Sequence, residues 1–378
     1  MQNCFLFARE IARMVVVVRS LFALTLPVLP AEGLIMEINC AFAPTLATPD
    51  HIALAEEIGF DRAWVYDVPL AFADSGIALA AAAERTTKIR LGVSVFTPHL
   101  RHIATNAGLI AHLATIAPGR FDAGFGVGFT SAAFLGRKPV KWNDLEKYVA
   151  ALRTLLEGKE VEWDGSVLSL MHTGRTGISY PIDVPIWIAA HGPKGFATAM
   201  RLGAGVVTAR IHGKNPVPFE GKCQLLFAGT ILDDDETFDS PRVLDAAGPG
   251  ACITLHLGEF GPLAGTAQAA GYASEISAID ESRRHLELHR GHLIEPNAID
   301  RRYLDGEVIR LGSTSGSPVQ VATALAELER AGATAVLYQP GGSDIGRELR
   351  SFYKAAQLRR EFFSDGGNTD KSLEVENA

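Results

Sequence analysis

The chain is poor in cysteine, in positive charge and in long apolar runs. Its 378 residues include only four cysteines, which are widely separated, so neither a disulfide framework nor a cysteine metal site is indicated. There are 35 basic and 43 acidic residues, a net charge of −8, and the basic surface that nucleic-acid binding needs is therefore missing. We expect a reduced, cytoplasmic setting and a small-molecule substrate, with no nucleic-acid or membrane partner.

Motifs of nucleophilic and phosphate chemistry are also missing. We find no Ser-His-Asp order, no phosphate-binding P-loop and no G-x-S-x-G element. Low-complexity tracts and solenoid repeats are absent as well. What remains is an ordinary composition, 47% apolar and 21% charged, typical of a folded enzyme with a sizeable core.

The first 35 residues differ from the rest. They contain the apolar stretch "MVVVVRSLFALTLPVLPAEG" after two arginines, which resembles a signal peptide. Glu10 lies in that basic start, however, Arg19 interrupts the apolar run, and the run is short for a membrane span. We interpret residues 1–35 as a disordered leader or a start site assigned too early, with the domain beginning at Met36.

From Met36 the sequence alternates between strand and helix patterns. Short apolar, β-branched runs precede segments with apolar residues at helical spacing. Strands are predicted at 37–43, 61–67, 88–96, 120–128, 184–190, 204–209, 223–232 and 334–340, and helices at 48–60, 75–86, 103–118, 143–159, 193–203, 240–251 and 345–356. Eight such units predict a (β/α)₈ TIM barrel over 36–356, with an open doubly wound sheet as the alternative.

Three further segments interrupt or follow this pattern. Residues 161–170 predict a hairpin that turns at Asp164-Gly165. Residues 260–315 predict an irregular helical insertion between the seventh and eighth strands, and residues 357–378 a polar C-terminal tail.

The fourth strand carries the glycine-rich run "GRFDAGFGVGF" over 119–129. A dinucleotide fingerprint needs G-x-G-x-x-G after the first strand, which this is not. Alternate residues of a strand share a face, so Gly124, Gly126 and Gly128 remove side chains from one face. That face either lets a planar ring approach the backbone or packs tightly inside the barrel.

Polar residues follow two other strands. "IAAHGPKG" after the fifth strand places glycines before a helix whose positive end favours an anion, with Lys194 nearby. "HLRH" after the third strand places His99 and His102 where they either hold an anionic group, exchange protons, or make polar contacts at the helix start.

A later segment, "HLELHRGH", spaces His285, His289 and His292 along one helical face. It lacks the H-E-x-x-H order of a zinc protease, so we interpret these as surface or core histidines and predict no metal site. His292, near the end of the motif, is a candidate to reach the barrel mouth.

Five motifs in order carry a resemblance: "WVYDV", "KIRLGVSVFTPHLRHIA", "LATIAPGRFDAGFGVG", "LEKYVAALRTLLEGKEVEWDG" and "PIWIAAHGPKG". Together they are similar to the bacterial luciferase-like family. More narrowly, they resemble its branch with methylenetetrahydromethanopterin reductase and other enzymes of the deazaflavin coenzyme F420. The resemblance extends from about Met36 to Ala356 and implies a flavin-type cofactor in the barrel mouth.

The resemblance also implies residue roles. An acid follows strand two beside the ring, a bulge in strand three backs the ring, and loops after strands four and five contact the cofactor's side chain and phosphate. The cofactor-binding residues implied are Asp67, Ser94, Val95, Thr97, Gly126, Val127, Gly128, Ala190, His191, Gly192 and Pro193. No catalytic residue is identified, but the candidates are Asp67, His99, His102 and His292.

By the same resemblance the protein is an oxidoreductase that transfers a hydride between F420 and a small organic substrate. An FMN-dependent monooxygenase is the alternative, and a non-catalytic flavin-binding barrel is a third possibility. A homo-oligomer, most simply a dimer, is expected. Val68 and Phe129 replace the histidine and glutamate that some deazaflavin dehydrogenases carry, which argues against a sugar-phosphate dehydrogenase.

The glycine run yields an expectation for mutants. Gly126→Val or Gly128→Val is expected to abolish cofactor binding while largely preserving the fold, because valine suits strands. If these glycines instead pack against helices or have positive φ, the same changes lower the stability by several kcal/mol through overpacking or strain.

Overall fold

The computed structural model describes residues 36–209, 219, 221–258 and 261–360. The leader and nearly all of the C-terminal tail lie outside these residues, as does Cys4. The three described cysteines, Cys40, Cys223 and Cys252, are buried and free.

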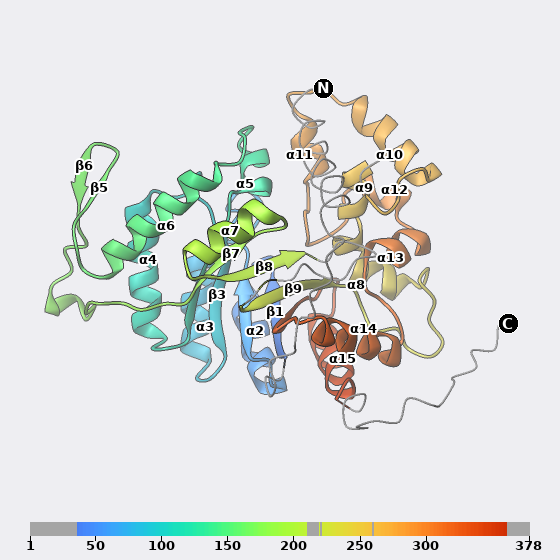
Figure 1. The fold of residues 1–378 in the computed structure, drawn as a ribbon. Coiled ribbons are helices and arrows are strands. Elements are labelled where there is room, and N and C mark those ends of the chain that lie inside the picture. Colours follow the sequence, from blue (N-terminus) through green and yellow to red (C-terminus); the bar gives the residue numbers. More distant parts are fainter. Residues whose placement is uncertain (1–35, 210–218, 220, 259–260, 361–378) are drawn as a thin grey trace, which may run out of the picture.

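Eight parallel strands close into a barrel in the order β1-β10-β9-β8-β7-β4-β3-β2 (Figure 1). The predicted TIM barrel is confirmed, and the open-sheet alternative is wrong because β1 pairs with both β2 and β10. The strands are β1 (Glu37–Phe42), β2 (Arg62–Val65), β3 (Arg90–Phe96), β4 (Phe121–Phe125), β7 (Ile186–Ala189), β8 (Gly205–Ala209), β9 (Cys223–Ala228) and β10 (Ala335–Gln339).

Two tryptophans fill the middle of the barrel. The rings of Trp64 and Trp187 meet edge to face, with centroids 5.8 Å apart, a favourable aromatic geometry. Glycines stand against both rings: a Cβ on Gly92 would lie 2.6 Å from the Trp64 ring, and one on Gly205 would lie 2.5 Å from the Trp187 ring. Large and small residues on neighbouring strands thus interlock, as close packing requires.

Below the tryptophans lies a buried polar network around Asp122 on β4. Its carboxylate accepts hydrogen bonds from Arg62 Nε at 3.1 Å, Arg90 Nε at 2.8 Å and Trp187 Nε1 at 3.1 Å. The Asp122 side chain is fully buried and that of Arg62 is 4% exposed. The network therefore joins β2, β3, β4 and β7 at the amino end of the barrel.

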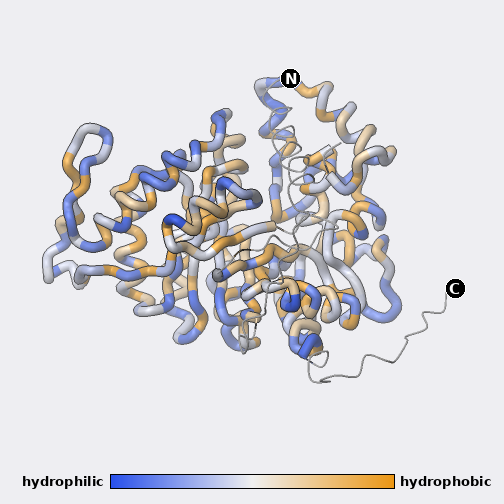
Figure 2. The backbone as a smooth tube through the Cα atoms, viewed as in Figure 1, coloured by the Kyte–Doolittle hydropathy of each residue, from blue (hydrophilic) through white to orange (hydrophobic). Residues whose placement is uncertain are grey.

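Amphipathic helices surround the strands, with hydrophobic and hydrophilic positions alternating along them (Figure 2). Helix α14 is absent from the predicted set, although Ser317 and Gln320 form a capping box at its start. The helices of the barrel are α2 (Thr48–Ile58), α3 (Ser75–Arg85), α4 (Ile103–Ile116), α6 (Trp142–Leu156), α7 (Pro193–Arg201), α14 (Pro318–Arg330) and α15 (Ile345–Leu358), with the short α5 (Phe129–Phe134) after β4.

The predicted hairpin is confirmed as β5 (Val161–Trp163) and β6 (Ser166–Leu168), which project from the body (Figure 1). Asp164 and Gly165 have φ of 49° and 77°. Positive φ at both central residues is the requirement of a two-residue hairpin turn that Asp-Gly meets.

A helical insertion lies between β9 and the last β–α unit, beside the barrel (Figure 1). It begins before the predicted 260–315 and has its own apolar cluster, which includes Val243, Leu255, Tyr272 and Ile309. Its helices are α8 (Pro241–Ala251), α9 (Ile253–Leu257), α10 (Ala267–Ser277), α11 (Arg284–Leu288), α12 (Asp300–Tyr303) and α13 (Gly306–Gly312).

None of the helices in the described part of the chain is long and apolar enough to cross a membrane.

Candidate cofactor site at the carboxyl end of the barrel

Small residues end the interior face of several strands. Trp187 and Val207 pack in the barrel interior, and the side chains two positions further along a strand share that face. Those positions are Ala189 and Ala209, both half-buried. By the same rule Tyr66 follows Trp64 on this face, and its hydroxyl donates to Gln339 Oε1 at 2.7 Å. The carboxyl end of the barrel is thus lined by short side chains beside one tyrosine.

The β3 bulge occupies the same face. The register of β3 against β4 shifts between Val93 and Phe96, and the Ser94–Val95 peptide is cis. A Cβ on Gly126 would lie 2.7 Å from Val95 Cγ2, and one on Gly124 would lie 2.5 Å from the Val93 carbonyl oxygen. These glycines therefore make room for the bulge, which favours tight packing inside the barrel, the second of the two interpretations of their face. Val95 is the side chain placed over them.

Gly128 has a different role from the two glycines before it. It caps α5 with φ of +81°, a conformation that favours glycine. A Cβ there would lie 2.8 Å from Ser131 Oγ, whose hydroxyl shares a 3.1 Å hydrogen bond with Thr97 Oγ1. Valine at 128 would be strained, so the expectation that Gly128→Val preserves the fold is corrected. Val127 before it is buried.

Asp67, at the end of β2, is committed to an ion pair. Its carboxylate accepts from Arg101 Nε and Nη2, each at 3.0 Å, and from Ser75 Oγ at 2.8 Å. Arg101 also donates to Asp74 at 2.8 Å. The hydrogen bond with Asp67 raises the pKa of Arg101 above its usual value. Both oxygens of the buried Asp67 are thus occupied, and the ion pair joins the loops after β2 and β3. A cofactor-binding or catalytic role of Asp67 stays a prediction.

Asp67→Asn is expected to lower the free energy of unfolding by about 1.5–3 kcal/mol, the range for hydrogen bonds to charged groups. The loss stays below that of a fully buried ion pair because Arg101 keeps Asp74. Chemical denaturation of Asp67→Asn, Arg101→Met and the double variant measures the coupling energy between the two residues. An unchanged stability together with lost turnover would instead make Asp67 a proton donor or acceptor.

The β7 end presents His191 and the start of α7. His191 Nδ1 accepts from the backbone N–H of Ala209 at 3.1 Å, so the proton of the neutral ring is on Nε2. Burial lowers the pKa of His191, which keeps this ring neutral. Gly192 is the N-cap of α7 and Pro193 follows at its first turn, while Ala190 is buried beneath them. The first-turn N–H groups of α7 thus lie beside an imidazole donor at the edge of the barrel.

The two histidines after β3 make local contacts. His99 Nε2 bonds the Lys138 carbonyl oxygen at 2.8 Å, and His102 is the N-cap of α4, where Nδ1 accepts from Ala104 N at 3.3 Å. His102 thus caps a helix, whereas His99 contacts the loop between α5 and α6. Their proposed catalytic use remains a prediction.

His292 lies in the helical insertion with two other histidines. The structure groups it with His256 and His289, whereas the sequence motif grouped it with His289 and His285. The His289 ring packs against the Phe134 ring of α5, with centroids 5.2 Å apart. A segment distant in sequence therefore reaches the loop after β4, which linear spacing does not reveal.

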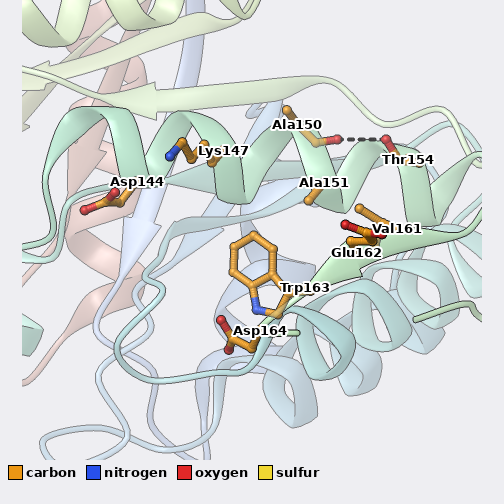
Figure 3. A pocket seen from close by; sticks show the side chains of 9 residues that line it. All are labelled: Asp144, Lys147, Ala150, Ala151, Thr154, Val161, Glu162, Trp163 and Asp164. Carbon is orange, nitrogen blue, oxygen red and sulfur yellow. Dashed lines mark hydrogen bonds between the residues drawn. The ribbon is translucent and has the colours of Figure 1, made fainter. Parts of the chain in front are cut away.

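A groove on the outer side of the barrel is separate from these strand ends. Figure 3 shows it between α6 and the β5–β6 hairpin, with Lys147 and Asp144 on the helix and Trp163 on the hairpin. None of the predicted cofactor residues lines it, so we assign it no role.

The chain is similar to proteins of known family and structure. Residues 43–215 match the family described as luciferase-like monooxygenase. This segment of the chain is similar to the luciferase-like family. The 5,10-methylenetetrahydromethanopterin reductase of Archaeoglobus fulgidus is 28% identical to the chain over 327 residues, which cover 82% of the chain and 92% of that protein.

A second relative matches the chain over a shorter stretch. The F420-dependent glucose-6-phosphate dehydrogenase of Beutenbergia cavernae is 33% identical over 183 residues, or 43% of this chain and 52% of the relative. Among solved structures, the coenzyme F420 dependent tetrahydromethanopterin reductase of Methanopyrus kandleri superposes with a TM-score of 0.62 at 19% identity. That superposition covers 86% of this chain and 99% of the other, and it shows a shared fold.

Proposed function

We propose that this luciferase-like protein is an F420-dependent oxidoreductase that transfers a hydride between the deazaflavin and a small organic substrate. The observation that carries the proposal is the carboxyl end of the barrel, where Val95, Ala189 and Ala209 provide a surface of short apolar side chains next to the start of α7. The names of its relatives support the deazaflavin: one is an F420-dependent dehydrogenase, and a structural neighbour is an F420-dependent reductase.

The residues at this end fit such a cofactor. A planar ring needs flat apolar support, which the Val95 side chain and the two alanines offer. An anionic tail needs donors, which the first-turn N–H groups of α7 and His191 Nε2 offer. Gly126, Val127 and Gly128 bring the loop after β4 against the bulge at Val95 and Thr97. When bound, F420 supplies the hydride acceptor or donor.

The protein's own part is to position the substrate and the cofactor and to exclude water from them. The Asp67–Arg101 pair joins two loops at the rim, and the Tyr66–Gln339 hydrogen bond connects β2 to β10 across the interior face. Such fixed side chains hold substrate and cofactor in register without reorganising during the reaction.

The substrate is not expected to be a sugar phosphate. Val68 is 9% exposed and Phe129 37% exposed, and neither can exchange a proton. They stand where the resemblance places the acid and base of a sugar-phosphate dehydrogenase. The F420-dependent dehydrogenase among the relatives thus informs the cofactor of this protein and not its substrate.

The first test is cofactor choice. F420 and FMN are titrated separately into the purified protein while tryptophan fluorescence is recorded, because Trp64 and Trp187 pack in the barrel interior, on the face that ends at the proposed site. We expect saturable quenching by F420 at micromolar concentration and weaker binding of FMN. Tighter binding of FMN would favour the monooxygenase that the family description mentions. If neither binds, the proposal fails, and F420 binding without turnover on alcohols, aldehydes and enones would indicate a non-catalytic barrel.

A matched pair of variants locates the site. Ala189→Leu fills the surface at the end of β7 and is expected to weaken F420 binding at least tenfold, with little change in the thermal midpoint, because the side chain extends beyond the packed core. Ala270→Leu, at an exposed position of α10, is the control and should bind as the parent does. Equal affinities for both variants would place the cofactor elsewhere.

A further inference from the structure

Three histidines from two segments of the insertion converge. His256 lies in α9, His289 directly follows α11, and His292 lies in the next turn. Each offers a ring nitrogen, and these three atoms lie within 4.8 Å of one another. The ring centroids are 5.2–6.4 Å apart. In the described part of the chain no other group of histidine, cysteine or carboxylate side chains comes together in this way.

Two of the rings have buried nitrogens without partners. Nδ1 of His289 and Nδ1 of His292 are both inaccessible to solvent and have no hydrogen bond. Leaving a buried polar atom unsatisfied is unfavourable, so such atoms are rare in folded proteins. A metal ion at the centre of the cluster would give such nitrogens a partner, because an imidazole nitrogen with a free lone pair is a metal ligand.

The third histidine is held from behind by a carboxylate. His256 Nε2 donates to Asp300 Oδ1 at 3.2 Å, which leaves His256 Nδ1 as the ring's remaining nitrogen. Asp300 is itself fixed by Tyr272 Oη at 2.9 Å and by the Asn297 backbone N–H at 3.2 Å. A histidine whose other nitrogen donates to an anchored carboxylate is the usual arrangement around protein-bound zinc.

We propose that His256, His289 and His292 bind one divalent transition-metal ion, with Zn²⁺ as the ion of choice and water in the fourth position. Three neutral imidazoles suit Zn²⁺, whereas Mg²⁺ and Ca²⁺ prefer oxygen ligands. Zinc–nitrogen distances of about 2.1 Å in a tetrahedron place the three nitrogens about 3.4 Å apart. The site is independent of the proposed redox function.

The ion would cross-link two segments of the insertion close to the barrel. It would join α9 to the segment after α11, and α11 packs against α5 next to the loop after β4. Zn²⁺ should therefore stabilise the insertion and limit its movement relative to that loop. The reason that sequence spacing missed the site is that His256 lies far from the HLELHRGH motif in the chain.

Metal binding to the full-length protein tests the proposal directly. The purified protein is stripped with a chelator, then titrated with Zn²⁺ by calorimetry and with Co²⁺ by visible absorption, which reports tetrahedral coordination. We expect one ion per chain with micromolar or tighter affinity, and a rise in the thermal midpoint on adding Zn²⁺. His289→Gln and His292→Gln should each weaken binding at least a hundredfold, and Asp300→Asn should weaken it by about 10–100-fold, the range for outer-shell partners.

His285→Gln is the matched control because His285 belongs to the same motif but lies outside the cluster. It should bind Zn²⁺ and gain thermal stability as the parent does. Circular dichroism of each metal-free variant checks that it is folded, and Asp300→Asn provides a second arm if a histidine variant is not. No saturable binding by the parent, or equal binding by His285→Gln and His292→Gln, would overturn the proposal.

Discussion

Replacing Asp122 with alanine is expected to lower the free energy of unfolding by about 3–5 kcal/mol, the range for breaking a buried ion pair from one side. Asp122 is fully buried and accepts from Arg62, Arg90 and Trp187. Arg62 is nearly buried and keeps only Glu37 as an ion-pair partner, at 2.7 Å. The buried guanidinium of Arg62 thus loses one of its two carboxylate partners, and the indole N–H of Trp187 loses its acceptor inside the barrel.

Denaturant unfolding followed by circular dichroism measures this loss. The control is Glu157→Ala, which breaks a pair with Lys159 whose two side chains are 50% and 69% exposed. That change should stay within about 0.5 kcal/mol of the parent, as exposed pairs contribute little. Comparable losses in the two variants would show that the network beneath the tryptophans is not a source of stability.

Gly126→Val is the second large expected effect. A Cβ at this position already comes within 2.7 Å of Val95 Cγ2, and two further methyl groups would push the bulge out of the barrel. We expect a loss of about 1–3 kcal/mol from overpacking, accompanied by at least a tenfold loss of F420 affinity because Val95 is displaced. The free energy of unfolding and the F420 affinity should therefore fall together. If the glycine face were open, the affinity alone would fall.

Gly108→Ala is the matched control with the opposite sign. Gly108 lies inside α4 and a Cβ there meets no atom within 4 Å. Alanine should therefore stabilise the protein by about 0.5–1 kcal/mol through the helix backbone, with unchanged cofactor affinity. Thermal midpoints and F420 titrations of both variants complete the comparison. A normal midpoint for Gly126→Val would show that the bulge can yield at no cost.

Much of the fold could be predicted from short stretches of sequence, because turns and strands depend on neighbouring residues. The Asp164-Gly165 turn follows from two residues that tolerate positive φ. Strands buried on both faces appear as continuous apolar runs, so the eight barrel strands were recognisable one by one. Helix α14 was not predicted, although its capping box is visible in the sequence, and the insertion starts earlier than expected.

The site required information that no local pattern contains. Asp67, Val95, Gly126 and His191 were implied as cofactor residues by the resemblance to the luciferase-like family, which places them near the carboxyl ends of strands two to five. Sequence alone does not show that Asp67 forms an ion pair with Arg101, because these side chains meet across two loops. Nor does it show that Gly126 faces Val95, which depends on the bulge in β3.

By itself, the sequence determined a (β/α)₈ barrel with a luciferase-like order of motifs, because strand and helix periodicities and turn chemistry are properties of neighbouring residues. Only the tertiary structure decided which polar groups are paired, which glycines are crowded and which histidines converge. His256 and His292 illustrate the difference: helices α10 and α11 lie between them in the chain, and only the packing of the insertion brings their ring centroids to 6.4 Å from each other. Contacts between distant segments are set by the whole packed chain, so no window of sequence can contain them.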